Sequence, residues 1–181
     1  MTIDPASLRI QIHPAEILRR VADPIDPTEE VRAVAQRMLK LMKGAQGIGL
    51  AGPQVGLGWR IFVCDVPAED TAAHDPPVAS DGPMVFINPT IESATGEVEG
   101  YAEGCLSLPG ITGDVFRQPT VTVKALNAAS EPFELTATGL LGRCIQHEID
   151  HLDGVLILDR MTDESKQRTA AQVKNLEKMR R

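Results

Sequence analysis

The sequence predicts a fold of the α+β class, with short antiparallel strands packed around a buried central helix and a further helix at the C-terminus. Several short segments between residues 60 and 137 have the branched and aromatic content of β-strands. The segment 138–153 is apolar almost all round, which is typical of a helix inside a protein. Short strands together with one buried helix indicate the α+β class.

The first predicted helix begins near Asp26 and ends at Gly44. Asp26 can cap it, Pro27 suits the first helical position, and Glu29 occupies the capping-box position. Its apolar residues then recur at helical spacing: Val31, Val34, Ala35, Met38, Leu41 and Met42. The glycine-rich segment 47–56 follows, and we expect a loop or a short edge strand there.

The predicted strands occupy five segments, and an exposed loop spans 68–83. The strands are expected at 60–66, 84–88, 90–93, 120–125 and 133–137. Thr138 can cap the buried helix, and Gly154 can end it. A last helix should begin after Thr162.

Length and charge suggest one body with a basic tail. The chain has 181 residues, which suits a single domain, and we expect residues 1–159 to form one catalytic domain. The tail, 160–181, carries seven Lys/Arg and three acidic residues, so its net charge is +4, while the whole chain carries −7. This overall charge and an aromatic content of 3% disfavour a DNA-binding function.

Further features of composition indicate a cytoplasmic protein without a membrane partner. No apolar run approaches the ~20 residues of a membrane span. The first residues lack the basic start and apolar stretch of a signal peptide. Three cysteines are an odd and low number, which fits a reducing compartment with thiols that are free or bound to metal.

The strongest chemical signal is the His-Glu-x-x-His pattern of 147–151 in the predicted buried helix. Because His147 and His151 are four positions apart, they share one helix face and can both bind a single metal ion. Glu148 lies beside that ion and can accept a proton from water activated there. The alternative is a pair of histidines that satisfy each other, but buried imidazoles and a carboxylate are costly without a compensating ion.

A catalytic metal needs a third protein ligand, and several candidates are unsuitable. The position where metzincins carry a third histidine is Ile157, and the downstream glutamates lie in the basic tail. Cys144 is ~10 Å along the helix axis from His151, so we expect it to line the surroundings of the metal. His13 and His74 are expected at the surface, and Cys64 in an apolar strand.

Cys105 is the predicted third ligand. It lies in the segment Glu-Gly-Cys-Leu-Ser-Leu-Pro-Gly of 103–110, which we expect to be irregular. Gly104 allows close approach of the backbone, and a nearby cation can stabilise the thiolate of Cys105.

Three segments together resemble the peptide deformylase family of bacterial type. They are GIGLAGPQVG at 47–56, EGCLSLPG at 103–110 and QHEIDHLDG at 146–154, in the order and spacing of that family. The resemblance extends from the first helix to Arg160. One departure is Gly52, where the family usually has alanine, beside the key Gln54.

The resemblance implies an enzyme that removes the formyl group from the initiator methionine of new polypeptides and releases formate. It assigns the metal ligands to Cys105, His147 and His151. The family's preferred ion in the cell is Fe²⁺, although Zn²⁺, Ni²⁺ or Co²⁺ can occupy the site. By the same resemblance, Glu148 transfers the proton, and two donors stabilise the oxyanion: the side-chain amide of Gln54 and the backbone N–H of Leu106.

The resemblance also implies a binding site for the formylmethionyl peptide. Four residues line the methionine pocket: Ile48, Leu140, Cys144 and His147. Gly49 and Gly104 offer backbone groups to the peptide chain, as an added strand does. Some family members dock on the ribosome through a C-terminal helix, and the basic tail makes the same hypothesis reasonable here.

Two other functions are compatible with parts of the sequence. A small zincin-type endopeptidase would use the same His-Glu-x-x-His pattern and cleave internal peptide bonds. An inactive metal-binding or structural protein would need a fourth protein ligand and no base, which the presence of Glu148, Gln54 and Cys105 disfavours.

Overall fold

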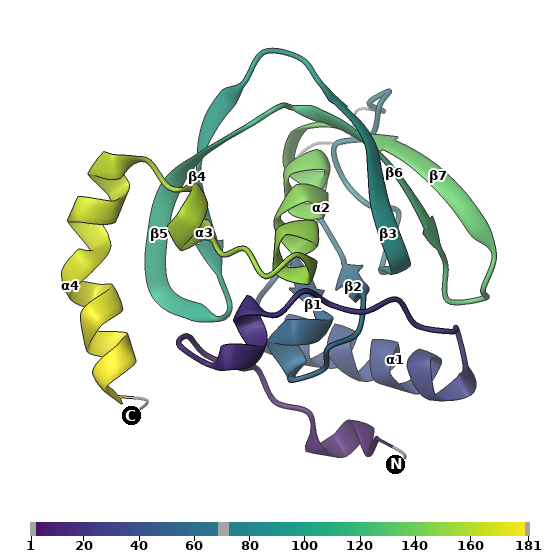
Figure 1. Ribbon diagram of the computed structural model, residues 1–181. Coiled ribbons are helices and arrows are strands. Elements are labelled where there is room, and N and C mark those ends of the chain that lie inside the picture. The colour runs from purple at the N-terminus through teal and green to yellow at the C-terminus, as the bar shows by residue number, and fades with distance from the viewer. Residues whose placement is uncertain (1–2, 69–72, 180–181) are drawn as a thin grey trace.

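The computed structural model describes residues 3–68 and 73–179, and Figure 1 shows the arrangement of its elements. Part of the predicted loop (69–72) and the last two arginines of the basic tail lie outside the described residues. The structure is a mixed α+β fold with antiparallel sheets and a C-terminal helix, which confirms the predicted class. Short 3-10 helices complete it: η1 (Pro5–Ser7), η2 (Glu16–Arg19) and η3 (Gly52–Val55).

The larger sheet has five antiparallel strands in the order β1-β2-β3-β6-β7. Their bounds are β1 (Gly49–Ala51), β2 (Ile61–Cys64), β3 (Met84–Thr95), β6 (Thr120–Leu126) and β7 (Pro132–Ala137). The two strands predicted at 84–88 and 90–93 are one strand, β3, with an irregular register beside β6. Asn88, which has a positive φ of 52°, lies at the first irregularity, and this local break explains why the sequence looks like two strands.

A second sheet consists of the hairpin β4 (Glu99–Cys105) and β5 (Leu108–Arg117). The prediction of an irregular segment at 103–110 was therefore wrong, because most of it belongs to paired strands. The register shifts only between Gly104 and Cys105, where the hairpin turns. Glycines and a proline depress the strand signal of this segment, and long-range packing overrides it.

Helix α1 (Glu29–Gly44) begins later than predicted. Thr28, not Asp26, is the N-cap, and its hydroxyl accepts a hydrogen bond from the backbone N–H of Val31. The predicted apolar stripe is largely buried, with Val34, Met38 and Met42 fully covered against the sheet. This packing holds β1 and β2 in place, and with them the glycine-rich segment.

Helix α2 (Gly139–Leu152) carries the His-Glu-x-x-His pattern. In Figure 1 it runs between the β4–β5 hairpin and the larger sheet. Thr138 occupies the N-cap position without a capping bond. Its hydroxyl accepts a hydrogen bond from the hydroxyl of Thr120 and donates one to the carbonyl of Pro119. Leu141, Ile145 and Leu152 are buried in the core together with Phe62 and Phe86 of the sheet. The apolar side of α2 is thus fixed against the sheet, and its histidines are turned toward the hairpin.

Helices α3 (Ile157–Arg160) and α4 (Asp163–Met179) lie against the outer edge of the hairpin (Figure 1). Leu176 of α4 is buried in a cluster with Ile111 and Val115 of β5. The hydroxyl of Ser165 donates to Asp114 at 2.9 Å, which fastens the start of α4 to β5. The basic tail is therefore a helix packed on the hairpin. Within the described part of the chain, no helix has the length and apolarity that crossing a membrane requires.

Candidate metal centre and active site

Three potential metal ligands converge where α2 meets the end of β4. The rings of His147 and His151 lie with their centroids 5.0 Å apart, and the sulfur of Cys105 is 3.2 Å from Nε2 of His151. The donor atoms of all three residues lie within 4.8 Å of one another. Among residues 3–68 and 73–179, no other three His, Cys, Asp or Glu side chains gather in this way.

The chemistry of this cluster fits a divalent metal ion. A thiolate and two imidazoles are donors that late first-row metals prefer. Burial, helped by the charge on His147, lowers the pKa of His151 well below its ordinary value, which favours the neutral form that binds metal. Nδ1 of His151 is buried and has no hydrogen-bond partner within the described chain. The cluster could therefore hold a metal ion.

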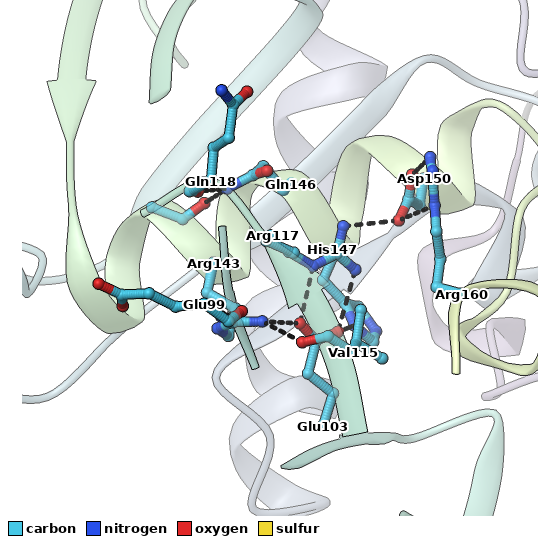
Figure 2. Close-up of polar contacts among 11 residues, drawn as sticks. Glu99, Glu103, Val115, Arg117, Gln118, Arg143, Gln146, His147, Asp150 and Arg160 are labelled. Atoms are coloured by element: carbon cyan, nitrogen blue, oxygen red, sulfur yellow. Dashed lines mark hydrogen bonds and ion pairs between the residues drawn. The ribbon is translucent and has the colours of Figure 1, made fainter. Parts of the chain in front are cut away.

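The orientation of His147 is set by Glu103 on β4 (Figure 2). Nδ1 of His147 lies 3.0 Å from the Glu103 carboxylate, so Nε2 is free to face Cys105 and His151. Burial alone lowers the pKa of His147, but hydrogen bonds to Cys105 and Glu103 outweigh it and raise that pKa well above its usual range. The raised pKa favours a ring with a proton on both nitrogens, and an ion that binds at Nε2 would displace the proton there.

Glu103 belongs to a buried network of charges that joins β4, β5 and α2 (Figure 2). Arg117 donates to its carboxylate twice, at 2.7 and 3.0 Å, and Arg143 donates once, at 2.9 Å. Arg117 also donates to Asp150 of α2 at 2.8 Å. Burial raises the pKa of Glu103, but the hydrogen bonds from His147 and Arg117 outweigh it and hold that pKa well below the usual range. Sequence reasoning gave no role to Glu103, Arg117 or Asp150, because their contacts are long-range.

Glu148 lies on α2 beside the cluster and is buried. Burial raises the pKa of Glu148 to about 7, although the charge of His147 opposes the shift. Its Oε2 has no hydrogen-bond partner among the described residues. Gly49 of β1 faces it closely, and a side chain there would overlap the carboxylate. Glu148 can therefore accept or release a proton near neutral pH.

The Gln54 side chain reaches the cluster from η3 and is almost fully buried. Its Oε1 accepts a hydrogen bond from the backbone N–H of Ala51 at 2.8 Å. Its Nε2 lies 3.2 Å from Oγ of Ser107 and 3.5 Å from the sulfur of Cys105. The donor end of the amide therefore faces the metal cluster, as an oxyanion donor requires.

A cavity of about 650 Å³ opens beside these groups. Its lining includes every predicted site residue except the metal ligand His151: Ile48, Gly49, Gln54, Gly104, Cys105, Leu106, Leu140, Cys144, His147 and Glu148. Cys144 is buried and stays outside the three-donor cluster, as expected. Ile10, Ile12, Tyr101 and Arg143 also line the cavity and were not predicted, because no motif marks them.

One of the two histidines expected at the surface is buried. His13 is 8% exposed, and its Nε2 lies 3.1 Å from Glu177 on α4. The prediction for His13 was wrong because its partner is 164 positions away in the sequence. His74 is exposed, and Cys64 is buried in β2, as predicted.

Hydrolysis at a metal centre requires three protein donors, an open side and a nearby proton acceptor. The Cys105–His147–His151 cluster lies at the wall of a cavity with Glu148 beside it. The fold and the site together define the class of metal-dependent hydrolases.

The family model described as polypeptide deformylase matches residues 7–167, and the chain belongs to this family. It is 42% identical over 164 residues to a peptide deformylase of Parasynechococcus marenigrum (strain WH8102), covering 90% of this chain and 78% of that protein. A solved peptide deformylase from Ehrlichia chaffeensis has a TM-score of 0.86 at 32% identity and covers 95% of this chain and 97% of its own. Another, from Synechococcus elongatus in complex with actinonin, has a TM-score of 0.80 at 36% identity, over 94% and 88% of the two chains.

Proposed function

We propose that this chain removes the formyl group from the N-terminal methionine of nascent polypeptides, with one divalent ion held by Cys105, His147 and His151. The observation that carries the proposal is the convergence of these three side chains beside Glu148 in one cavity. Fe²⁺ is the proposed ion in the cell, and Zn²⁺, Ni²⁺ or Co²⁺ suit the same donors. The bound ion supplies Lewis-acid activation of water and of the formyl carbonyl.

The protein's own groups handle the proton and the developing charge. The Glu148 carboxylate accepts a proton from the attacking water and then delivers it to the leaving amine nitrogen. Nε2 of Gln54 and the backbone N–H of Leu106 donate hydrogen bonds to the formyl oxygen as it gains negative charge. The products are formate and a free N-terminal amine.

The cavity is suited to an extended peptide with an unbranched apolar first side chain. We propose that Ile48, Leu140 and Cys144 surround the methionine side chain together with the ring of His147. Gly49 and Gly104 would bind the peptide backbone in the manner of an added strand. Such a pocket discriminates against polar side chains more strongly than against an isosteric apolar one.

We further propose that the enzyme works in the cytoplasm and meets its substrates at the ribosome. Support for ribosome docking comes from the basic tail, in which Lys166, Arg168, Lys174 and Lys178 of α4 are exposed. Ribosomal RNA is a polyanion and would attract such a surface. Residues 1–159 remain the proposed catalytic domain, with α4 packed on its hairpin.

A formate-release assay tests the proposed function. The anaerobically purified protein, with its metal content measured, should release formate from formyl-Met-Ala-Ser. Cleavage of internal peptide bonds without formate release would instead support the zincin-type endopeptidase, which the family assignment disfavours. Neither activity in metal-loaded protein would leave only the metal-binding alternative.

A further inference from the structure

The amide of Gln54 is anchored at both of its ends. Oε1 accepts from the N–H of Ala51 at 2.8 Å, and Nε2 donates to Oγ of Ser107 at 3.2 Å. The second N–H of Nε2 is left for the sulfur of Cys105, 3.5 Å away. Gln54 is 1% exposed and Ser107 is 0% exposed, so water does not compete for these hydrogen bonds.

A glutamine amide needs a hydrogen bond at each end before its orientation is fixed. The last torsion of a glutamine side chain is broad, so covalent preferences do not fix the plane of the amide. The backbone N–H of Ala51 can only donate, and therefore determines which end of the amide is oxygen. Because Ser107 accepts one of the two Nε2 protons, it fixes the rotation of the amide plane. The other proton is thereby aimed at the metal cluster.

Ser107 is itself held in a defined place by the N-terminal segment. It lies between β4 and β5, two positions after Cys105, and its carbonyl accepts from the N–H of His13 at 3.0 Å. Two positions earlier, the N–H of Gln11 donates to the carbonyl of Gln54 at 2.8 Å. The same short stretch of backbone thus fastens both residues of the side-chain pair.

We propose that Ser107 is a positioning residue for deformylation. Its hydroxyl holds the Gln54 amide so that the second N–H, which faces the Cys105 sulfur in the free protein, is donated to the formyl oxygen when substrate is bound. The inference deepens the proposed function and rests on the role of Gln54 in it. Ser107 acts through Gln54 and does not itself contact the reacting atoms.

The first test compares two buried serines in the metal-loaded enzyme. Ser107→Ala should lower kcat by about 3- to 10-fold, the effect of losing one neutral hydrogen bond, with KM and metal content close to wild type. Ser165→Ala is the matched control, because Ser165 is also fully buried but bonds to Asp114 on the far side of the hairpin. The control should leave kcat unchanged. An unchanged kcat in Ser107→Ala would overturn the inference.

A double-mutant cycle shows whether Ser107 acts through Gln54. In a Gln54→Ala background, Ser107→Ala should cause no further loss of kcat, whereas Ser107→Thr in the wild-type background should retain most of it. The same loss in both backgrounds would refute a positioning role. If Gln54→Ala itself changed nothing, the inference would also fall, while formate release by the wild-type enzyme would still uphold deformylation.

A spectroscopic measurement is independent of turnover. In Co²⁺-loaded protein, a hydrogen bond to the Cys105 thiolate lowers the energy of the sulfur electrons. Ser107→Ala should loosen the Gln54 contact and move the sulfur-to-cobalt charge-transfer band to longer wavelength, and Ser165→Ala should not. An identical band in both variants would contradict the inference. If Ser107→Ala does not fold, the wild-type protein loaded with Zn²⁺ provides the test. The side-chain amide protons of Gln54 should exchange slowly with solvent, and fast exchange would overturn the inference.

Discussion

Oε2 of Glu103 lies 3.0 Å from Nδ1 of His147, so a carboxylate on the hairpin fixes the ring orientation of a predicted metal ligand on the helix. Glu103→Gln should weaken metal binding by about 10- to 100-fold, because the ring loses its fixed orientation. The variant also leaves Arg143 without its carboxylate partner and Arg117 with Asp150 alone. This loss of buried charge pairing should cost about 3–5 kcal/mol of the free energy of unfolding.

Metal titration and denaturant unfolding of the same Glu103→Gln sample would check both expectations. Glu99→Gln is a suitable control, since Glu99 also lies on β4 but contacts Arg143 only through its backbone carbonyl. Wild-type metal affinity in Glu103→Gln would show that the carboxylate does not orient the ring.

Glu148→Gln should abolish most of the turnover and leave metal binding intact. The amide keeps the size of the side chain but cannot accept a proton from water, so kcat should fall by about 10²-fold or more. Formate release and metal content should be measured on one preparation. Turnover within a few-fold of wild type would refute the proton-transfer role.

Cys105→Ser should reduce metal affinity strongly, because a hydroxyl is a far weaker ligand than a thiolate for these ions. Cys64→Ala is the control, since Cys64 is buried in β2 outside the three-donor cluster. Metal analysis after dialysis should show loss of the ion in the first variant only. Loss of the ion in Cys64→Ala alone would mean that the ligand assignment is wrong.

Gly52→Ala should destabilise the protein, even though the family usually has alanine at this position. A Cβ on Gly52 would overlap the backbone carbonyl oxygen of Trp59, and backbone cannot move aside as easily as a side chain. Overpacking of this kind costs about 1–3 kcal/mol, which lowers Tm by about 2–4 °C for each kcal/mol. Gly58→Ala, where a Cβ would meet open space, is the matched control. Equal Tm values for the two variants would show that this contact relaxes freely.

The proposed ribosome contact is best tested by charge reversal on α4, because truncation would also remove the buried Leu176. Lys174→Glu combined with Lys178→Glu should weaken salt-sensitive ribosome binding and lower the salt slope by about 2. Activity on short formyl peptides should persist. Arg20→Glu with Lys40→Glu, two exposed sites elsewhere, is the control. Equal ribosome affinity in all these proteins would exclude docking through α4.

The sequence was informative where structure is local. The spacing of His147 and His151 is a property of one helix, and the structure places the two rings next to each other, with their centroids 5.0 Å apart. The choice of Cys105 relied on excluding other candidates, and the structure brings its sulfur to the same cluster. Their roles as metal ligands remain predictions.

The parts that could not be predicted depend on contacts between distant segments. The hairpin β4–β5 has a glycine-rich sequence, and its strands form because they pair with each other and pack on α3 and α4. The burial of His13 follows from Glu177 near the other end of the chain. The sequence could not show that Thr28 rather than Asp26 caps α1, because both residue types are good caps and local propensity does not separate them.

The double role of Arg117 has a consequence for engineering this enzyme. One guanidinium forms ion pairs with Glu103 of the hairpin and with Asp150 of the helix, the two elements that carry the proposed ligands. Replacing this buried ion network by apolar side chains is an ordinary route to a more heat-resistant scaffold. In this protein such a redesign would disturb the support of His147, so thermostabilising libraries should keep Arg117 and both of its carboxylate partners constant.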